Sequence, residues 1–310
     1  MKILIILILV VFAMAPMNPF FISDRENSDE TAREYDLSFK DREGDVDYYK
    51  MRTVYYHGNA IGITQNRDEL ITAVKREVLQ ILKDSHRVKY TWANSKLGHA
   101  NSLKGEIDDW KTLTFSDGFI YSLDLENMQF PECIDFGPLP KSMDGFRFMV
   151  NILDAHAQFE LLRTEASGRI SGLKRVGDRV VCPDAHQTAI LDFPPFSTDS
   201  TFTNGDYDTV FIGIWNRDGK SLAVLEYNNS ESKLSNTVNW NPEWAFIQRG
   251  TSNFWGHVYI DLESGKLAKG DLFEYVVIEM SSKGLETPLR LFERRTIEIQ
   301  KITKDEFETF

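Results

Sequence analysis

Apolar and polar positions alternate with a period of two along most of the second half of the chain. This period is typical of strands that bury one face. The strands predicted there are 209–215, 222–227, 258–262, 267–280 and 289–302. The turns between them are short, so consecutive strands must pair antiparallel, because parallel neighbours would need crossover helices.

The same alternation in the first half predicts further strands, at 35–40 and 49–55. Residues 113–115 and 119–125 flank Asp117-Gly118, a dipeptide that tolerates the positive φ of hairpin turns. We therefore expect a hairpin at that point.

Residues 70–83 fit two structures. Leu70, Val74 and Val78 fall at helical spacing, with Asn66 and Glu69 placed as a cap pair. The alternating segment 88–92 follows a turn-like Asp84-Ser85-His86, which would instead make 70–83 one arm of a long hairpin. Both alternatives stay open from the sequence.

One helix is predicted at about 142–163, where the period changes. Polar side chains are spaced by four, three and four residues, which places them in one narrow stripe; they are Arg147, Asn151, Asp154 and Gln158. Apolar side chains occupy the remaining surface. A helix of this kind must be covered on most sides, so we expect it to pack across a large concave surface.

These elements predict a mainly β fold, with α+β as the alternative if 70–83 is helical. The expected architecture is a large antiparallel curved sheet, or a half-open barrel of hairpins, packed on the long apolar helix. This arrangement resembles the half-open barrels of exported lipid and lipoprotein carriers. The resemblance is one of architecture and involves no residue motif, so it transfers no site residue.

The chain begins with an export signal. Residues 3–15 contain no polar side chain, and Ala13-Met14-Ala15 has the small-x-small pattern of a signal peptidase site. Pro16 hinders cleavage there, so residues 1–21 are either a signal peptide or an N-terminal membrane anchor. The protein is thus expected outside the cytosol, periplasmic or extracellular, and either released or anchored by residues 3–21.

An acidic spacer at 22–34 precedes a single β-rich domain at 35–310. Prolines at 131, 138 and 140 mark 131–141 as a candidate boundary within that domain. Cys133 and Cys182 are the two cysteines and a candidate disulfide in an exported chain. The alternative is a pair of buried free thiols.

Composition narrows the set of partners. The 310 residues are 42% hydrophobic, which provides material for a core, and the net charge of −12 disfavours nucleic acid and anionic membrane surfaces. Membrane contact is expected only through the N-terminal segment, if it is uncleaved.

Catalytic and metal-binding motifs are weak. The chain lacks G-x-S-x-G, HExxH, P-loop and GxGxxG patterns, and we expect no cofactor. Two D-x-H pairs occur, at Asp154/His156 and Asp184/His186. Residues two apart on a helix point in different directions, so we interpret His156 as a buried histidine and Asp154 as a surface residue. The second pair follows Cys182-Pro183 and is interpreted as an exposed turn. We therefore expect no metal site.

Our leading hypothesis is a noncatalytic exported protein that binds a hydrophobic, lipid-like ligand or an apolar segment of another exported protein. Leu153 and Phe159 would line the site on the helix. An alternative is a carbohydrate-binding or adhesion module that uses Trp240 and Trp244, which belong to a tryptophan cluster at 215–255. A carboxylate-dependent hydrolase ranks third.

Overall fold

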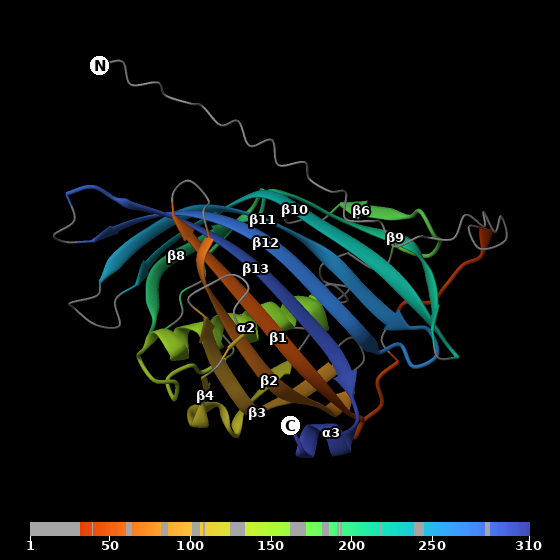
Figure 1. Ribbon diagram of the computed structural model, residues 1–310. Coiled ribbons are helices and arrows are strands. Elements are labelled where there is room, and N and C mark those ends of the chain that lie inside the picture. Colours follow the sequence, from red (N-terminus) through yellow and green to blue (C-terminus); the bar gives the residue numbers. More distant parts are fainter. Residues whose placement is uncertain are drawn as a thin grey trace.

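A broad antiparallel sheet arches over one helix in the computed structural model of the protein (Figure 1). The structure describes residues 32–310 except 39, 60–63, 82–85, 101–105, 108, 125–133, 162–171, 182–185, 191, 193, 218, 239–244 and 283–285. The predicted leader at 1–21, residues 22–31 of the predicted spacer at 22–34, both cysteines, and Trp240 and Trp244 lie outside the described residues.

The described residues form a sheet of 13 strands. In chain order these are β1 Val46–Asn59, β2 Thr64–Ile81, β3 His86–Ala100, β4 Trp110–Thr112, β5 Phe119–Asp124, β6 Arg179–Val181, β7 Thr188–Ile190, β8 Ser197–Thr203, β9 Asp206–Arg217, β10 Lys220–Val238, β11 Phe246–Asp261, β12 Leu267–Ser282 and β13 Leu289–Ile302. The helical elements are η1 Thr114–Ser116, α2 Met143–His156, the π-helical turn η2 Ala157–Leu161 and α3 Lys304–Glu308.

The strand order is β4-β3-β2-β1-β13-β12-β11-β10-β8-β7, with β5 on β3, β9 on β10 and β6 on β9. The pairing of β1 with β13 joins the first and last strands in the middle of the sheet. Two hairpin ladders, β1-β2-β3 and β9 to β13, thereby become one continuous surface. The fold is mainly β and antiparallel, as the sequence pattern predicts.

The two faces of the sheet differ in what they contact. We call the face toward α2 the inner face and the opposite face the outer face. Thr53 lies on the inner face, where its hydroxyl meets α2, and its register partners Leu70 and Ile297 share that face. The period of two then assigns every other residue of these strands to the outer face.

The core lies between the inner face and α2. Phe148 of α2 is fully buried and meets the rings of Trp92 and Phe119 edge-on at 5.6 and 6.0 Å between ring centroids. Ile152 and Ala155 are also fully buried. The buried side of α2 therefore packs against β3 and β5.

Residues 70–81 are extended and belong to β2, which settles the open alternative in favour of the hairpin. Leu70, Val74 and Val78 all lie on the inner face and are buried. Their spacing of four residues fits both a helix and every second inner position of a strand, which is why the pattern was ambiguous.

Two of the predicted strands are wrong. Residues 35–38 form no strand; Leu37 is buried in the core and the Tyr35 amide donates to the Lys174 carbonyl, so the alternation there reflects packing without a ladder. The expected hairpin at 113–125 is also absent from the described residues, because 114–116 form η1 and β5 pairs with β3. Gly118 does have a positive φ of 77°.

The predicted helix is present as α2 followed by η2, with the α-helical part ending at His156. No helix within the described ranges is long and apolar enough to cross a bilayer.

Truncation of a buried side chain on α2 tests its role in the core. We expect Ile152→Ala to lower the free energy of unfolding by about 2–5 kcal/mol, because it removes buried methyl groups and leaves a cavity. Met143→Ala, at an exposed position of the same helix, should change it by less than about 0.5 kcal/mol. Chemical denaturation measures both, and equal small effects would show that α2 is not packed as described.

Candidate functional site

The polar stripe of α2 faces the sheet, where it contacts four different strands. Arg147 contacts Asp68 of β2, and Asn151 contacts Thr53 of β1. Asp154 contacts Arg295 of β13, and Gln158, in the following turn η2, contacts Tyr227 of β10. The distances between the bonded atoms are 2.5, 2.5, 2.6 and 2.5 Å. Buried polar groups on a sheet need hydrogen-bond partners. Each residue of the stripe has one here, while Asn151 Nδ2 and Gln158 Oε1 have none among the described residues.

Asp154 is therefore not the surface residue that the sequence predicts. The Arg295 guanidinium, itself buried, bonds Asp154 through Nη1 and pairs with Glu274 of β12 through Nη2. Burial raises the pKa of Asp154 to about 7, although the charge of Arg295 opposes that shift. The error arose because a polar stripe on a helix is usually solvated, whereas here the sheet supplies partners for it.

Asp68 of β2 is the centre of a second cluster, which includes Arg147 in the N-terminal half of α2. Its carboxylate lies 3.0 Å from His57 Nε2, 2.5 Å from His99 Nδ1 and 2.5 Å from Arg147 Nη2. Burial opposes ionisation, but the hydrogen bond from His57 and the charge of Arg147 lower the pKa of Asp68 to about 2.

His57 is shared between two carboxylates, with its Nδ1 3.2 Å from Glu293 Oε2. Burial lowers the pKa of His57, but the hydrogen bonds with Asp68 and Glu293 outweigh it and raise the pKa to about 9. The imidazole is thus cationic at neutral pH. This cluster forms a row of charged side chains across the inner face, together with Arg295 and Glu274.

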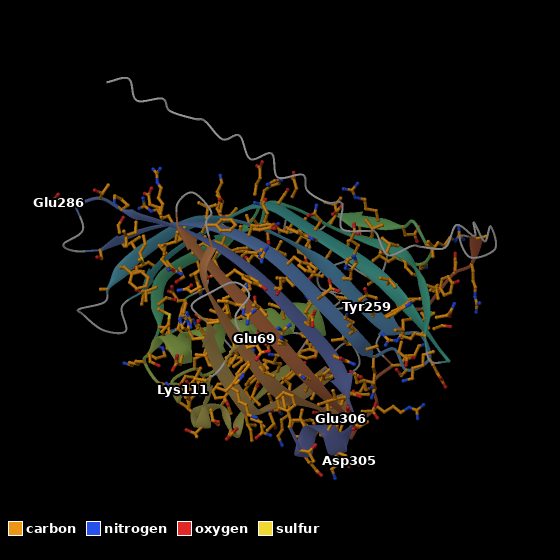
Figure 2. The ribbon with its side chains drawn as sticks, in the orientation of Figure 1. Glu69, Lys111, Tyr259, Glu286, Asp305 and Glu306 are labelled. Carbon is orange, nitrogen blue, oxygen red and sulfur yellow. The ribbon has the colours of Figure 1, made fainter. Side chains whose placement is uncertain are left out.

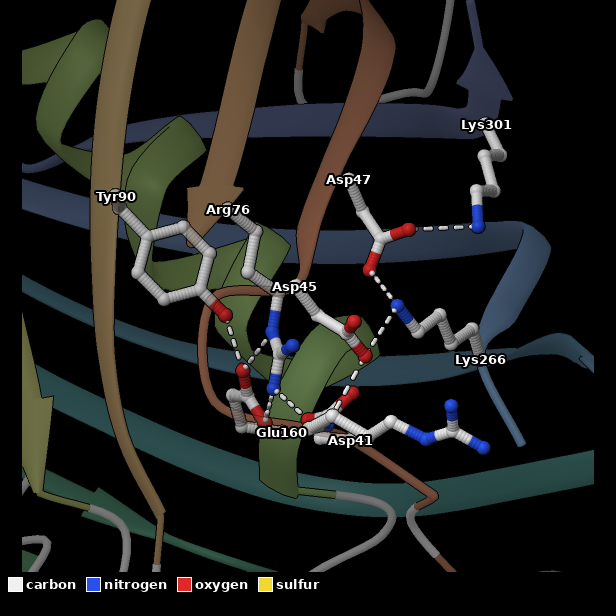
Figure 3. Close-up of polar contacts among 9 residues, drawn as sticks. Asp41, Asp45, Asp47, Arg76, Tyr90, Glu160, Lys266 and Lys301 are labelled. Atoms are coloured by element: carbon white, nitrogen blue, oxygen red, sulfur yellow. Dashed lines mark hydrogen bonds and ion pairs between the residues drawn. The ribbon is translucent and has the colours of Figure 1, made fainter. Parts of the chain in front are cut away.

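A third polar cluster surrounds the π-helical turn (Figure 3). Glu160 is fully buried and accepts from Arg76 Nε at 2.8 Å and from the Tyr90 hydroxyl. Arg76 Nη2 also donates to Asp41 at 2.8 Å. Burial lowers the pKa of Arg76, but the charge of Glu160 outweighs it and raises that pKa above its ordinary value.

Lysine and aspartate side chains continue this cluster toward the strand ends (Figure 3). Lys266 Nζ lies 2.9 Å from Asp45 and 3.1 Å from Asp47, and Lys301 Nζ lies 2.7 Å from Asp47. A cavity of about 10 Å³ lies beside these residues; it is lined by Asp41, Asp47, Tyr49, Arg76, Phe159, Lys266 and Leu267. Such a volume accommodates about one water molecule.

The residues of the first D-x-H pair have separate partners. His156 is fully buried, its Nε2 lies 2.6 Å from the Tyr121 hydroxyl, and burial lowers its pKa to about 3. In the second pair, the described residue is His186, which is exposed and lies 2.9 Å from Asp206. The described part of the chain contains no group of three or more His, Cys, Asp or Glu side chains placed to hold a metal ion.

The two helix residues expected at a ligand site belong to the core. Phe159 is buried, with ring centroids 4.7 Å from Tyr49 and 5.8 Å from Tyr90, and Leu153 packs partly buried against the same core. A ligand-binding role for Leu153 and Phe159 stays a prediction, as it does for Trp240 and Trp244.

An apolar strip lies on the inner face beyond the charged row. We define the apolar strip as Ile278, Met280, Leu289 and Leu291, which pair across β12 and β13 as Leu291 with Ile278 and Leu289 with Met280. Leu289 and Leu291 are 45% and 37% exposed, and the other two are partly exposed. The part of the inner face beneath α2 is buried, whereas this end of the face is open to solvent.

Sequence reasoning missed the apolar strip, although a signal for it exists. Leu289 and Leu291 have the same parity as Ile297 and Ile299, which the alternation placed on one face. Charged residues at 293 and 295 interrupt that apolar series, and only the structure shows that these charges pair with side chains of α2 and the neighbouring strands.

Comparison with protein-family models and with curated proteins finds no match. Among solved structures, the chain is similar to lipovitellin, in a structure of its lipid–protein interactions, with a TM-score of 0.37 and 11% identity over 84% of this chain. The chain spans 25% of that lipovitellin chain.

A second similar structure is a Bacteroides fragilis protein inferred to be exported, with a YmcC-like fold; the TM-score is 0.19 and the identity 10%, over 86% of this chain and 99% of that one. A third is Salmonella typhi OmpF in complex with daunomycin, with a TM-score of 0.21 and 10% identity over 84% of this chain and 98% of that one. Likenesses at these TM-scores carry no argument about function.

Removal of one charge from the π-turn cluster tests whether that cluster is buried and coupled. We expect Arg76→Met to lower the free energy of unfolding by about 3–5 kcal/mol, because it leaves Glu160 and Asp41 as buried carboxylates without their cation. Arg290→Met, which removes an exposed pair with Glu279, should cost less than about 1 kcal/mol. Similar losses for the two variants in chemical denaturation would contradict the burial of Arg76.

The raised pKa of His57 predicts a pH dependence of stability. A histidine in the unfolded chain titrates near 6.5, whereas folded His57 keeps its proton up to about pH 9. Its stabilising contribution is therefore complete below pH 6.5 and is lost as the pH rises through 9. Denaturation between pH 6 and 9.5 should show a smaller loss of stability in His57→Gln than in the wild type, while the exposed-site control His186→Gln should keep the wild-type slope.

Proposed function

We propose that this is a noncatalytic exported protein that binds a hydrophobic, lipid-like ligand on the apolar strip. The supporting observation is that the inner face continues past α2 and there carries apolar side chains that remain partly open to solvent. Apolar side chains that stay open to solvent leave water when an acyl chain covers them, which favours binding. The apolar leader at 3–15 supports export.

The space beneath α2 is a poorer location for such a ligand. Side chains of the core and of the polar clusters fill it, and the cavity beside Phe159 holds about one water molecule. A ligand there would have to displace buried ion pairs, among them Arg76 with Glu160, and breaking such a pair costs several kcal/mol.

The size of the apolar strip favours a small amphipathic ligand over a protein segment. Neighbouring strands lie about 5 Å apart and residues on one face of a strand lie about 7 Å apart, so the strip measures on the order of 100 Å². A stable protein interface buries about 800 Å² per partner. The adjacent charged row at His57 and Glu293 is suited to the polar end of an acyl chain that rests on Leu291.

The competing hypotheses lack a comparable observation. The carbohydrate-binding alternative depends on Trp240 and Trp244, which the structure does not describe. The hydrolase alternative depends on carboxylates whose pKa values are shifted, but the clearest case, Asp154, is bonded to Arg295 inside the interface between α2 and β13.

Lauric acid is a suitable probe for the apolar strip. Native mass spectrometry of the purified chain with lauric acid, and separately with phosphatidylcholine vesicles, should show uptake of the acyl compound by the wild type. Leu291→Asp should reduce uptake at least tenfold, because it places a carboxylate where the chain must rest. The matched control is Val277→Asp, which lies next to Ile278 in β12 but on the outer face and is 52% exposed.

Circular dichroism melting checks that both variants fold. A wild type that retains a clean unliganded mass with both compounds would exclude the proposed function. Equal loss of uptake in Leu291→Asp and Val277→Asp would exclude the apolar strip as its site.

A further inference from the structure

Aromatic rings gather on four neighbouring strands of the outer face. We define the aromatic band as Trp255 of β11, Phe273 and Tyr275 of β12, Phe292 of β13 and Tyr56 of β1. Trp255 lies 6.1 Å from Phe273 and 5.5 Å from Tyr275, and Tyr275 lies 5.7 Å from Phe292, between ring centroids. Tyr275 is 39% exposed and its neighbours are partly exposed, so solvent reaches the band.

The rings of β11, β12 and β13 lie against one another, with planes that differ by 21° to 35°. Tyrosine and tryptophan rings carry large apolar areas with one polar end. The exposed part of the band is therefore a surface on which the apolar side chains of a partner can pack.

Arg294 lies within the aromatic band and lacks a carboxylate partner among the described residues. It is the register partner of both Tyr56 and Tyr275, and its guanidinium lies 4.0 Å from the centroid of the Tyr56 ring. Its Nε is buried and has no hydrogen-bond acceptor. Arg52, on the same face, instead forms two hydrogen bonds with Glu69, at 2.6 and 3.0 Å.

A second group of the same composition lies farther along the outer face. Trp215 of β9 and Tyr259 of β11 are 5.4 Å apart, and each carries a cation over its ring: Arg217 at 5.2 Å and Lys269 at 5.5 Å. Glu69 and Tyr259, both labelled in Figure 2, mark the β2 and β11 parts of this face. Aromatic rings with cations therefore recur on the outer face of a chain whose net charge is −12.

We propose that the outer face docks an acidic, apolar-rich segment of a partner protein, with a partner carboxylate bound by Arg294 and the partner's apolar side chains on the aromatic band. Charge complementarity supports this occupant, because a guanidinium that lacks a carboxylate partner among the described residues and lies among aromatic rings is matched by a carboxylate flanked by apolar groups. Arginine, tyrosine and tryptophan are also the residues that dominate the energetics of protein interfaces.

A sugar is a weaker candidate, because a neutral sugar leaves the charge of Arg294 unmatched. An anionic bilayer shares the carboxylate's charge, but it is broad and flat whereas the outer face is the outside of an arch (Figure 1). The test treats both as competing outcomes. The aromatic band is on the opposite face of the sheet from the apolar strip, so this proposal does not depend on the proposed function.

The probe is a fluorescein-labelled 12-residue peptide of alternating aspartate and tyrosine, measured by fluorescence anisotropy at about 0.15 M salt. The control probe replaces each aspartate by asparagine. We expect the acidic peptide to bind at least tenfold more tightly than the asparagine peptide. Arg294→Gln should weaken binding of the acidic peptide at least fivefold, whereas Arg52→Gln, whose guanidinium is already paired, should leave it within twofold.

Melting temperatures of both variants establish that they are folded, and Tyr275→Ala provides a second variant in the band that should weaken binding without removing a charge. Equal binding of the two peptides, or unchanged binding by Arg294→Gln, would overturn the proposal. So would binding of phosphatidylglycerol vesicles or of neutral glycans that Arg294→Gln abolishes while the peptides fail to bind.

Discussion

Hydrogen bonds and ion pairs between the inner face and the polar stripe of α2 and η2 fix the position of the helix on the sheet. Polar groups that leave water must find partners, and here four strands supply them, from β2 at one end of the helix to β10 at the other. Each bond restricts the rotation of α2 about its axis as well as its position along the sheet. This orientation places the apolar sides of the helix against the core, where Phe148 and Ile152 are fully buried.

The position of α2 on the inner face determines which parts of the sheet remain open to solvent. A helix of 14 residues is about 21 Å long, which is shorter than the width of a sheet of 13 strands. Beneath α2 the inner face is filled, and beyond the charged row it ends in the apolar strip. The outer face has no covering helix in the described part of the chain and carries the aromatic band. One short helix on one wide sheet therefore leaves two surfaces with different chemistry. They are the apolar strip on the inner face, proposed for an acyl chain, and the aromatic band with Arg294 on the outer face, proposed for an acidic protein segment.

Local patterns predicted much of this fold, because hairpins with short turns are encoded by neighbouring residues. The strand at 289–302 and the β9–β10 and β11–β12 hairpins were found in this way. Long-range pairing was not visible: nothing in 70–83 indicates that Val74 packs beside a strand rather than along a helix, and nothing in 35–40 shows that Leu37 is buried without a ladder. The meaning of the stripe on α2 was also hidden, because the partner of Asp154 is Arg295, 141 residues away. For the same reason the apolar strip and the aromatic band, both built across strands, could not be assembled from one segment.

In this structure α2 seals the inner face beneath it, while the apolar strip stays open to solvent. Solvent paramagnetic relaxation enhancement of methyl groups, measured by NMR with a water-soluble gadolinium chelate, tests it without any substitution. We expect strong enhancement for the methyls of Leu289 and Leu291 that falls when lauric acid is added, and weak enhancement for Ile297 and Ile299 with or without it. Strong enhancement at Ile297 and Ile299, or protection of Leu289 and Leu291 in the absence of lauric acid, would show that α2 does not cover the sheet in this way.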